Sequence, residues 1–425
     1  MKKLRERQYL CIDLKSFYAS VECVERGLDP MTTDLIVADP ERSDKTICLA
    51  VSPSLKAKGV KNRCRVFQIP PNLKYIMAPP RMQKYIDYAA EIYGVYLEYI
   101  APEDIHVYSI DEAFLDVTNY LYLYKTDAKG LAIRIMEDIY KKVGVRAACG
   151  IGTNLYLSKI ALDITAKHSE DFIGVLSEET YKKTMWNHKP LTDFWRIGKG
   201  TAERLAKYGI FTMGDIANAP EDFLYKLFGI DAELLIDHAF GRETATMRDI
   251  KNYKSKSNCL TSGQVLMRDY KFIEARLILK EMLDSLCLDM VSKNLVTDSV
   301  SIYIGYSNAL NIRGAKGTAN IQIKTNSDSL IIPAVTALYD RIVNPEYPVR
   351  RMNITFNRIT EDSGICQMAL FENNENTEKN KTIQETMLKI KSKYGKNSIL
   401  KGMNFEESAT MMERNRQIGG HKSGE

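Results

Sequence analysis

Short apolar runs alternate with stretches of helical periodicity over the first 175 residues of the chain. Apolar runs over residues 9–12 and 105–110 have the length of strands, and residues 113–117 resume the pattern after an acidic pair, Asp111 and Glu112. Two β-rich runs on either side of this pair predict a hairpin with the acids at its bend. Helical spacing of apolar residues recurs over residues 81–100, 130–143 and 154–167. Mixed helices and strands around a hairpin indicate an α+β unit with an antiparallel sheet.

The pattern changes twice in the rest of the chain. Helical spacing continues from about residue 175 to residue 245, and residues 246–258 are then polar, basic and poor in apolar side chains, as is typical of an interdomain linker. Residues 259–361 follow the order strand, helix, strand, strand, helix, strand, which predicts a second α/β unit. After residue 362 the chain is mostly polar, apart from an apolar cluster at 367–371 and a helical pattern over 383–394. We therefore expect a flexible tail over residues 362–425.

Composition narrows the class of protein. A length of 425 residues is too great for one ordinary core, so several domains are expected. The net charge of +5, from 59 Lys and Arg against 54 Asp and Glu, is too small to establish nucleic-acid binding by itself. The eight cysteines form no C-x-x-C pair, and no apolar window is long enough for a signal peptide or a transmembrane helix. We expect a soluble, cytoplasmic protein without a zinc site.

Three acids occupy positions suited to metal-assisted phosphoryl transfer. Asp13 follows the first apolar run, and Asp111 and Glu112 lie at the bend of the expected hairpin. If the strands are neighbours, their ends bring the carboxylates together, and the backbone carbonyl of Leu14 adds a further oxygen. Hard divalent cations prefer oxygen ligands, and a pair of them about 4 Å apart is the usual arrangement in polymerases. The spacing also allows a simpler interpretation, since an acid at a strand end is commonly solvated or caps a helix.

Two segments carry a resemblance to a known family. Residues 11–22, CIDLKSFYASVE, and residues 108–116, YSIDEAFLD, resemble the first and second catalytic motifs of Y-family DNA polymerases, in particular the bacterial UmuC/DinB branch. The resemblance extends in domain order from residue 9 to about residue 360. It implies a right-hand polymerase fold that contains a palm, small fingers, a helical thumb with a helix-hairpin-helix, and a little finger. The corresponding ranges are 1–17 and 82–174 (palm), 18–81 (fingers), 175–245 (thumb), 246–258 (linker) and 259–361 (little finger).

The resemblance also implies an activity. The family members are DNA-directed DNA polymerases of low fidelity that act in translesion synthesis, DNA repair and the mutagenic SOS response. The implied substrates are primer–template DNA and deoxynucleoside triphosphates, and the implied cofactor is a pair of Mg²⁺ ions, for which Mn²⁺ can substitute. In this chain the motif positions of the metal ligands are Asp13, Asp111 and Glu112, with the Leu14 carbonyl.

Further motif positions concern the nucleotide. Tyr18 occupies the steric-gate position, where a ring under the deoxyribose rejects a 2′-hydroxyl, although without the motif it would be interpreted as a core aromatic. Phe17, Lys56 and Lys167 match nucleotide-binding positions, whereas an isolated helix lysine is usually a solvated charge. The chain departs from the family at Pro53, which replaces a frequent tyrosine and removes a phosphate donor.

Two further segments suggest contacts with DNA and with a protein partner. The glycine-rich turn at residues 195–205 resembles the hairpin of a helix-hairpin-helix, in which backbone N–H groups and a helix N-terminus receive a DNA phosphate. The residues concerned are Gly198, Lys199, Gly200 and Arg204. Gln367, Leu370 and Phe371 resemble the short peptide by which bacterial polymerases bind the sliding clamp. The sequence leaves open whether a small accessory protein is needed. It also allows two other functions: a nucleotidyl cyclase-like enzyme and a non-catalytic DNA-binding protein.

Overall fold

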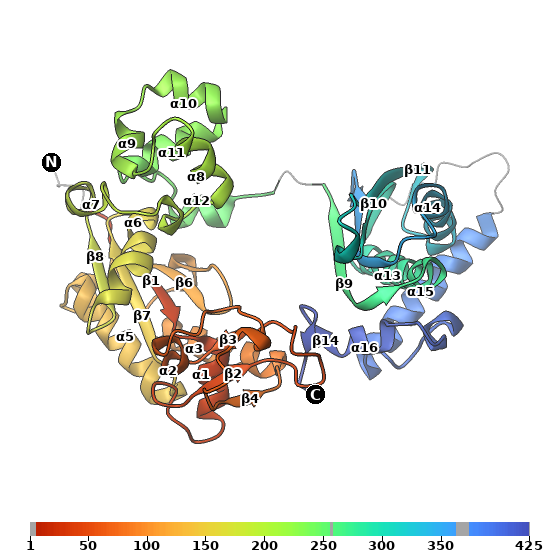
Figure 1. Cartoon of the computed structure of the whole chain (residues 1–425), viewed down its shortest axis with the longest axis horizontal. Coiled ribbons are helices and arrows are strands. Elements are labelled where there is room, and N and C mark those ends of the chain that lie inside the picture. Colours follow the sequence, from red (N-terminus) through yellow and green to blue (C-terminus); the bar gives the residue numbers. More distant parts are fainter. Residues whose placement is uncertain (1–5, 256–257, 363–373, 425) are drawn as a thin grey trace. The chain divides into compact units, whose positions relative to one another are not determined.

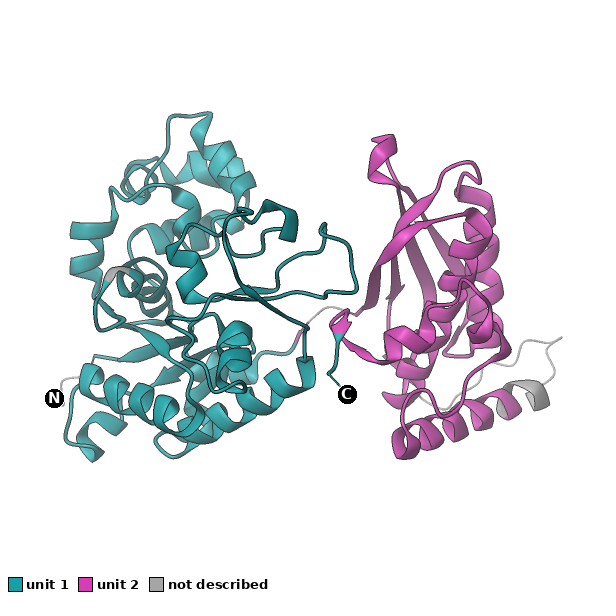
Figure 2. Cartoon of the chain, turned by 60° about the horizontal axis from the view of Figure 1, so that its bottom comes forward, with its two compact units in different colours: residues 1–254, 422–425 teal, residues 255–421 magenta. Residues whose placement is uncertain are grey.

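The computed structural model describes residues 6–255, 258–362 and 374–424 (Figure 1). The chain divides into two compact units, residues 1–254 with 422–425 and residues 255–421 (Figure 2). Helices and strands contribute to both units, which confirms the expected α+β multidomain class. None of the helices in the described part of the chain combines the length and apolarity that a bilayer crossing requires.

A five-stranded sheet organises the first unit, in the order β5-β6-β1-β7-β8. Its strands are β1 (Tyr9–Leu14), β5 (Ile105–Val107), β6 (Glu112–Asp116), β7 (Ala147–Gly152) and β8 (Ile173–Leu176). Successive side chains of β1 point to opposite faces, and Leu10, Cys11 and Ile12 are all fully buried, so packing covers both faces of the sheet. The expected antiparallel pairing is confirmed for β5, β6, β1 and β7, whereas β7 and β8 pair in parallel.

Helices α5 (Ala128–Val143) and α6 (Leu155–Ile160) pack on the central strands β1 and β7, and α3 (Met82–Leu97) packs against α5. Asn154 caps α6 by accepting from the Leu157 backbone N–H at 2.8 Å. A Cβ atom at Gly150 of β7 would lie 2.0 Å from the Ser158 carbonyl oxygen, so glycine lets the strand and this helix approach closely. After α6 the chain continues through a π-helical turn (Ala161–Thr165) and a 3₁₀ turn (Ala166–His168), within the helix expected over residues 154–167.

A second, three-stranded sheet lies in the segment that joins β1 to α3, with the order β3-β2-β4. Its elements are α1 (Phe17–Val24), β2 (Leu35–Val37), β3 (Ala50–Val51), α2 (Pro53–Ala57) and β4 (Ile76–Ala78). Ile36, Val51 and Leu55 form its small apolar core. Pro53 occupies the first turn of α2, where the missing N–H has no helical partner to lose, and Ser52 caps the helix.

Residues 175–245 are helical, as the periodicity predicts. The helices are α7 (Glu178–Met185), α8 (Lys199–Ala206), α9 (Met213–Asn218), α10 (Glu221–Phe228) and α11 (Asp231–Ala239). The first half of the expected linker at 246–258 differs from the prediction, because it forms α12 (Met247–Asn252). Thr246 and Asp249 form a capping box, and Met247 is buried against the five-stranded sheet. Met247 and the half-buried Ile250, together with the cap, order a segment whose composition resembles a linker.

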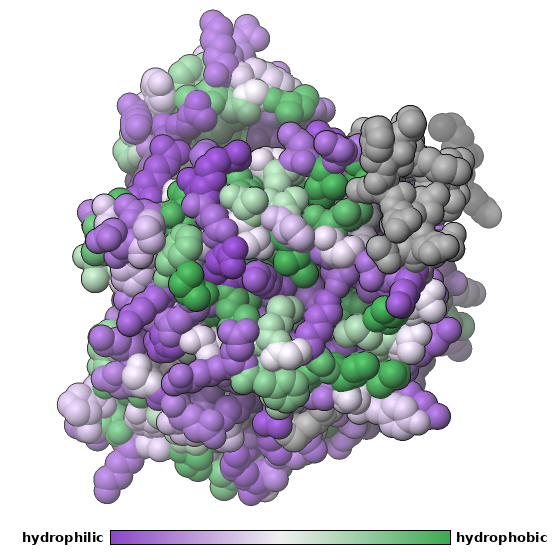
Figure 3. All heavy atoms as spheres, turned by 90° about the vertical axis from the view of Figure 1, so that its right-hand side faces the viewer, coloured by the Kyte–Doolittle hydropathy of each residue, from purple (hydrophilic) through white to green (hydrophobic). Residues whose placement is uncertain are grey.

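The second unit contains a five-stranded sheet: β11-β10-β12-β9 are neighbours in that order, the short β13 (Thr360–Glu361) also pairs with β10, and two helices pack against the sheet. Its elements are β9 (Leu260–Tyr270), α13 (Phe272–Ser292), β10 (Leu295–Tyr306), β11 (Ala315–Thr325), α14 (Asp328–Ile342) and β12 (Val349–Asn357). Along β11 half-buried and exposed residues alternate, which indicates a sheet with one solvated face. On the face seen in Figure 3, hydrophobic residues form small groups separated by hydrophilic ones.

The C-terminal segment differs most from its expectation. Residues 374–424 contain α15 (Asn374–Tyr394), which includes the helix expected over residues 383–394. They also contain a 3₁₀ turn (Gly402–Phe405) and α16 (Met411–Asn415) where the sequence predicts a flexible tail. The fully buried Glu281 of α13 accepts hydrogen bonds from Asn404 Nδ2 at 2.9 Å and from the Thr410 backbone N–H at 2.8 Å. The polar C-terminal segment is therefore held in place by a buried carboxylate, together with the buried side chains of Met387 and Met411.

Candidate active site

The backbone brings the three predicted acids to one end of the five-stranded sheet. Asp13, near the end of β1, is the register partner of Glu112, the first residue of β6. The Leu14 N–H donates to the Asp111 carbonyl at 2.9 Å, and the Tyr108 and Ser109 N–H groups both donate to the Glu112 carbonyl. The hairpin expected around the acidic pair is thus present, and antiparallel pairing places the acids beside the end of β1.

The three acids at this end of the sheet form a negatively charged cluster that the nearby lysines do not fully neutralise. Burial and, after it, the charges of Asp111 and Glu112 raise the pKa of Asp13 to about 7. Lys159 and Lys167 act in the opposite direction without offsetting the shift. A carboxylate in this state is stabilised by any cation that can reach it.

The side chains of the acidic pair already have protein partners. Glu112 accepts from Lys159 Nζ at 2.9 Å and from the Cys11 thiol at 3.2 Å, and Asp111 accepts from the Ser109 hydroxyl at 2.7 Å. In the described ranges, no group of three or more His, Cys, Asp or Glu side chains is arranged so that it could hold a metal ion. The donors themselves fit a hard divalent cation, because they are carboxylate oxygens on a partly buried edge.

Lys159 is a functional candidate that the sequence analysis missed. It is nearly buried on α6 and also contacts Asp163 at 3.1 Å, while Lys167 lies 3.6 Å from the same carboxylate. The three residues follow one another at intervals of four, which places them on one helical face. That spacing was the available signal, although an alternating charge row is more often a solvated helix face.

The two aromatic positions at the start of α1 have different environments. Phe17 is 2% exposed, so its side chain belongs to the core and can meet a nucleotide only through the backbone. Tyr18 is half-buried, and its ring stacks on that of Tyr85 with centroids 4.4 Å apart and an interplanar angle of 16°. The charge of Asp111 raises the pKa of Tyr18 after the larger effect of burial, so the ring lies near the acidic edge.

The predicted lysines share the electrostatic field of the acids. Loss of hydration lowers the pKa of Lys56, which lies on α2, while Asp13 and Asp111 act to raise it and Lys167 to lower it. The side chains of Lys56 and Lys167 are both exposed to solvent. Lys15, which the sequence analysis did not select, lies nearby with its ammonium 3.5 Å from the centre of the Phe172 ring. Positive charge thus gathers beside the carboxylates from three separate elements.

The glycine-rich turn lies where the sequence predicts a helix start. Gly198 is the N-cap of α8, and a Cβ atom at Gly198 or Gly200 would meet nothing within 4 Å, so both glycines are open to solvent. Lys199 is 86% exposed, and the Arg204 guanidinium lies 5.2 Å from the Phe228 ring centre. Trp195 joins this turn to the acidic hairpin, since its Nε1–H donates to the Tyr108 hydroxyl at 3.1 Å.

The clamp-like peptide, with Gln367, Leu370 and Phe371, lies outside the described residues.

Comparisons with known proteins agree with the motifs. Family models described as the impB/mucB/samB family and its C-terminal domain match residues 12–163 and 260–370. The putative UV-damage repair protein UvrX of Bacillus subtilis is 31% identical over 98% of both chains, and DNA polymerase IV 2 of the same organism is 29% identical over 98% of this chain and 99% of its own.

A solved structure agrees in fold. A Y-family DNA polymerase chimera matches with a TM-score of 0.64 at 20% identity, covering 83% of this chain and 99% of its own. The acidic strand ends, the motifs around them and these full-length matches lead to one assignment: the chain belongs to the impB/mucB/samB family of Y-family DNA polymerases.

Proposed function

We propose that the chain extends a DNA primer along a template with low fidelity, as a translesion polymerase of DNA repair and the SOS response. The observation that carries this proposal is the acidic edge formed by Asp13, Asp111 and Glu112. Burial and mutual repulsion raise the pKa of Asp13 to about 7, which is the state of a carboxylate that gains from a bound cation.

Polymerases of the Y family use divalent metal ions, and the proposed ligands of two Mg²⁺ ions here are the three carboxylates and the Leu14 carbonyl. When bound, such ions activate the primer hydroxyl and neutralise triphosphate charge. Mn²⁺ would fit the same oxygen donors. The protein's own contribution is to hold the oxygens: the Lys159 ammonium orients Glu112, and the Ser109 hydroxyl orients Asp111.

The nucleotide would lie beside this edge. Lys56 and Lys167 supply charge for the triphosphate, and Lys15 is close enough to contribute to the same field. The Tyr18 ring supports the deoxyribose and rejects a 2′-hydroxyl by collision. Phe17, whose side chain is buried, would contribute through its backbone. A single lysine point charge in place of a bidentate donor, together with Pro53, predicts modest triphosphate affinity.

The remaining segments are assigned by the same family correspondence. The palm is residues 1–17 and 82–174, the fingers are 18–81, the thumb is 175–245 and the little finger is 259–361. The open turn at Gly198, Lys199 and Gly200, with Arg204 behind it, would receive a DNA phosphate. Gln367, Leu370 and Phe371 would bind the bacterial sliding clamp, which raises the local concentration of the enzyme at a primer. We place this activity in the cytoplasm.

The test is primer extension with purified protein, Mg²⁺ and deoxynucleotides. Wild type is expected to extend the primer, and Asp111→Ala to abolish extension. Asp116→Asn, at the opposite end of the same strand β6, is the matched control and should retain activity. Tyr18→Ala should begin to accept ribonucleotides. An inactive wild type that binds primer–template and remains inactive with the sliding clamp would instead support a non-catalytic DNA-binding protein.

A further inference from the structure

Two pairs of residues interlock behind the Tyr18 ring. Tyr18 and Glu22 are one helical turn apart on α1, and Arg81 and Tyr85 are spaced in the same way at the start of α3. The two segments face one another: the Tyr18 ring stacks on Tyr85, and both Arg81 and Tyr85 bind Glu22. The four side chains form a closed arrangement in which each segment contributes one aromatic and one charged group.

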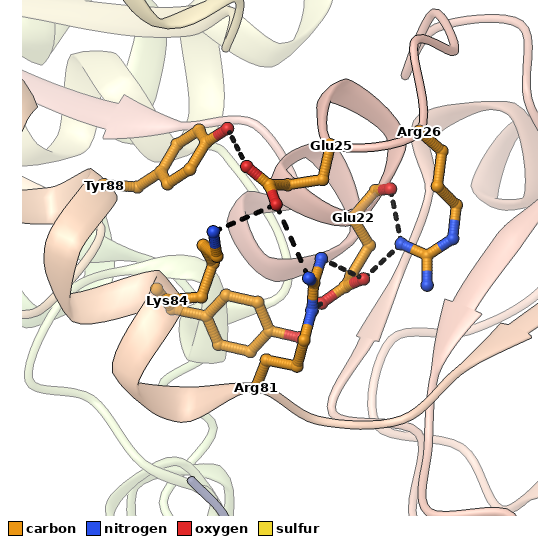
Figure 4. A network of polar contacts seen from close by, with 7 residues as sticks. Glu22, Glu25, Arg26, Arg81, Lys84 and Tyr88 are labelled. Carbon is orange, nitrogen blue, oxygen red and sulfur yellow. Dashed lines mark hydrogen bonds and ion pairs between the residues drawn. The ribbon is translucent and has the colours of Figure 1, made fainter. Parts of the chain in front are cut away.

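Glu22 accepts hydrogen bonds from both Arg81 and Tyr85 of this arrangement (Figure 4). Its side chain is completely buried, and its two carboxylate oxygens accept from Arg81 Nε and Nη2, both at 2.9 Å. The Tyr85 hydroxyl donates to the same carboxylate at 2.8 Å, and Arg26 donates from the turn that follows α1. Burial alone would raise the pKa of Glu22, but these hydrogen bonds outweigh burial and lower it. The carboxylate is therefore charged and fully engaged.

Tyr85 connects Glu22 to Tyr18, because its hydroxyl binds Glu22 and its ring stacks on that of Tyr18. Its side chain is 0% exposed, so its ring has no room to turn, and its hydroxyl is tied to Glu22. The ring of Tyr18, half-buried, rests on that fixed surface. A gate that works by collision discriminates only if its ring cannot turn aside when a larger sugar arrives. The stacked Tyr85 ring blocks one direction of that retreat.

We propose that Glu22, Arg81 and Tyr85 are positioning residues that set the sugar selectivity of the polymerase by holding the Tyr18 ring rigid. This inference rests on the proposed steric-gate role of Tyr18. It assigns a specificity function to three side chains that would otherwise be regarded only as part of the core between α1 and α3.

A neighbouring cluster on the same two elements provides a control. Glu25, one turn from Glu22, accepts from the Tyr88 hydroxyl at 2.8 Å and pairs with Lys84 at 3.1 Å (Figure 4). Within the described residues, the Tyr18 ring stacks on Tyr85 and has a tilted contact with Phe17, but it has no ring contact with Tyr88. Glu25 also lies 3.5 Å from Arg81 Nη1, so the control is placed at Tyr88, whose hydroxyl binds Glu25 and not Glu22.

The experiment compares kcat/KM for a deoxynucleotide and the matching ribonucleotide in single-nucleotide primer extension. Tyr85→Leu is expected to lower the preference for the deoxynucleotide about three- to tenfold, the equivalent of one lost aromatic pair. The change should arise from faster ribonucleotide insertion, with deoxynucleotide kcat/KM nearly unchanged. Tyr85→Phe keeps the ring and should retain most of the preference, and Glu22→Gln should lie between the two. Tyr88→Leu should leave the preference as in wild type.

Coupling to Tyr18 separates the possible outcomes. In a Tyr18→Ala background, Tyr85→Leu should change the preference no further, because there is no ring left to position. If Tyr85→Leu slows both nucleotides equally and leaves the preference unchanged, the network is only structural and the inference is overturned, while the polymerase proposal stands. If Tyr18→Ala itself leaves the preference unchanged, the gate assignment is wrong and this inference fails with it. Thermal unfolding of each variant confirms that it is folded.

Discussion

Asp13 and Glu22 belong to one sequence motif and are both removed from bulk water, yet their environments have opposite effects. Burial and two neighbouring acids raise the pKa of Asp13 to about 7. Hydrogen bonds from Arg81, Arg26 and Tyr85 outweigh the burial of Glu22 and lower its pKa. A buried carboxylate without enough cationic partners, such as Asp13, favours the binding of a cation. A carboxylate that is fully paired within the protein, such as Glu22, stabilises the fold.

The difference shows that burial of an acid does not by itself identify its role. The second unit provides another example, because Glu281 is as buried as Glu22 but is satisfied mainly by neutral donors of the C-terminal segment, such as the Thr410 N–H. The number and charge of the partners distinguish the three glutamate and aspartate sites. Replacing Asp13 should therefore lower activity without lowering stability, whereas replacing Glu22 or Glu281 should lower stability.

The largest effect is expected at Asp13. Asp13→Asn should reduce primer extension about a thousandfold or more, because a ligand of the catalytic ions is lost. The same change removes one of three repelling acids, so the thermal midpoint of the protein without added metal should stay the same or rise. Primer extension and a thermal scan on one preparation give both results. A marked fall in thermal stability would show that Asp13 is a structural acid like Glu22.

Glu22→Ala should have the converse effect. Removing the carboxylate leaves Arg81 and the Tyr85 hydroxyl without their buried partner, which costs about 3 kcal/mol in the free energy of unfolding of the first unit. The chain has two tryptophans, Trp186 and Trp195, and both lie in that unit, so urea unfolding followed by tryptophan fluorescence reports on it. Glu25→Ala, in the more exposed cluster, is the control and should cost less than about 1 kcal/mol.

Glu281→Ala should loosen the C-terminal segment rather than the whole second unit. The Thr410 and Met411 N–H groups would lose their acceptor, at about 2 kcal/mol, and their hydrogen exchange should accelerate roughly thirtyfold. Exchange of the β10 amides is the internal reference and should be unaffected. Equal acceleration of both sets would mean that Glu281 stabilises the core and not the attachment of this segment.

The smallest effect concerns pH. Because the pKa of Glu22 is lower in the folded protein than in the unfolded chain, its contribution to stability is complete above its ordinary value of 4.5. That contribution is lost as the pH falls through the folded pKa. The stability difference between wild type and Glu22→Gln should thus be constant from neutral pH down to about pH 5 and shrink below it. A difference that stays constant in more acidic solution would contradict the lowered pKa.

The sequence by itself determined the parts of this protein that local patterns specify. Alternating apolar runs predicted the hairpin at Asp111 and Glu112 and the helices α3 and α5, and the motifs around Asp13 indicated the family. These features were accessible because strand and helix periodicities, and the residues that chemistry requires at strand ends, are written in short continuous segments. The helical pattern over residues 383–394 predicted part of α15, but neither the attachment of the polar C-terminal segment nor α12 was predicted. A polar segment is expected to be flexible when the residue that anchors it lies far away in the sequence.

Tertiary structure alone decided which charges meet. Lys159 reaches Glu112 and Arg81 reaches Glu22 across 47 and 59 positions of the chain. No local periodicity encodes such a pairing, because it depends on how β6, α6, α1 and α3 pack. The same packing left Asp13 short of positive charge, gave Glu22 its full set of donors, and laid Tyr18 on Tyr85. Sequence thus identifies the chemical groups of the site, while long-range packing fixes the electrostatic environment that gives each group its role.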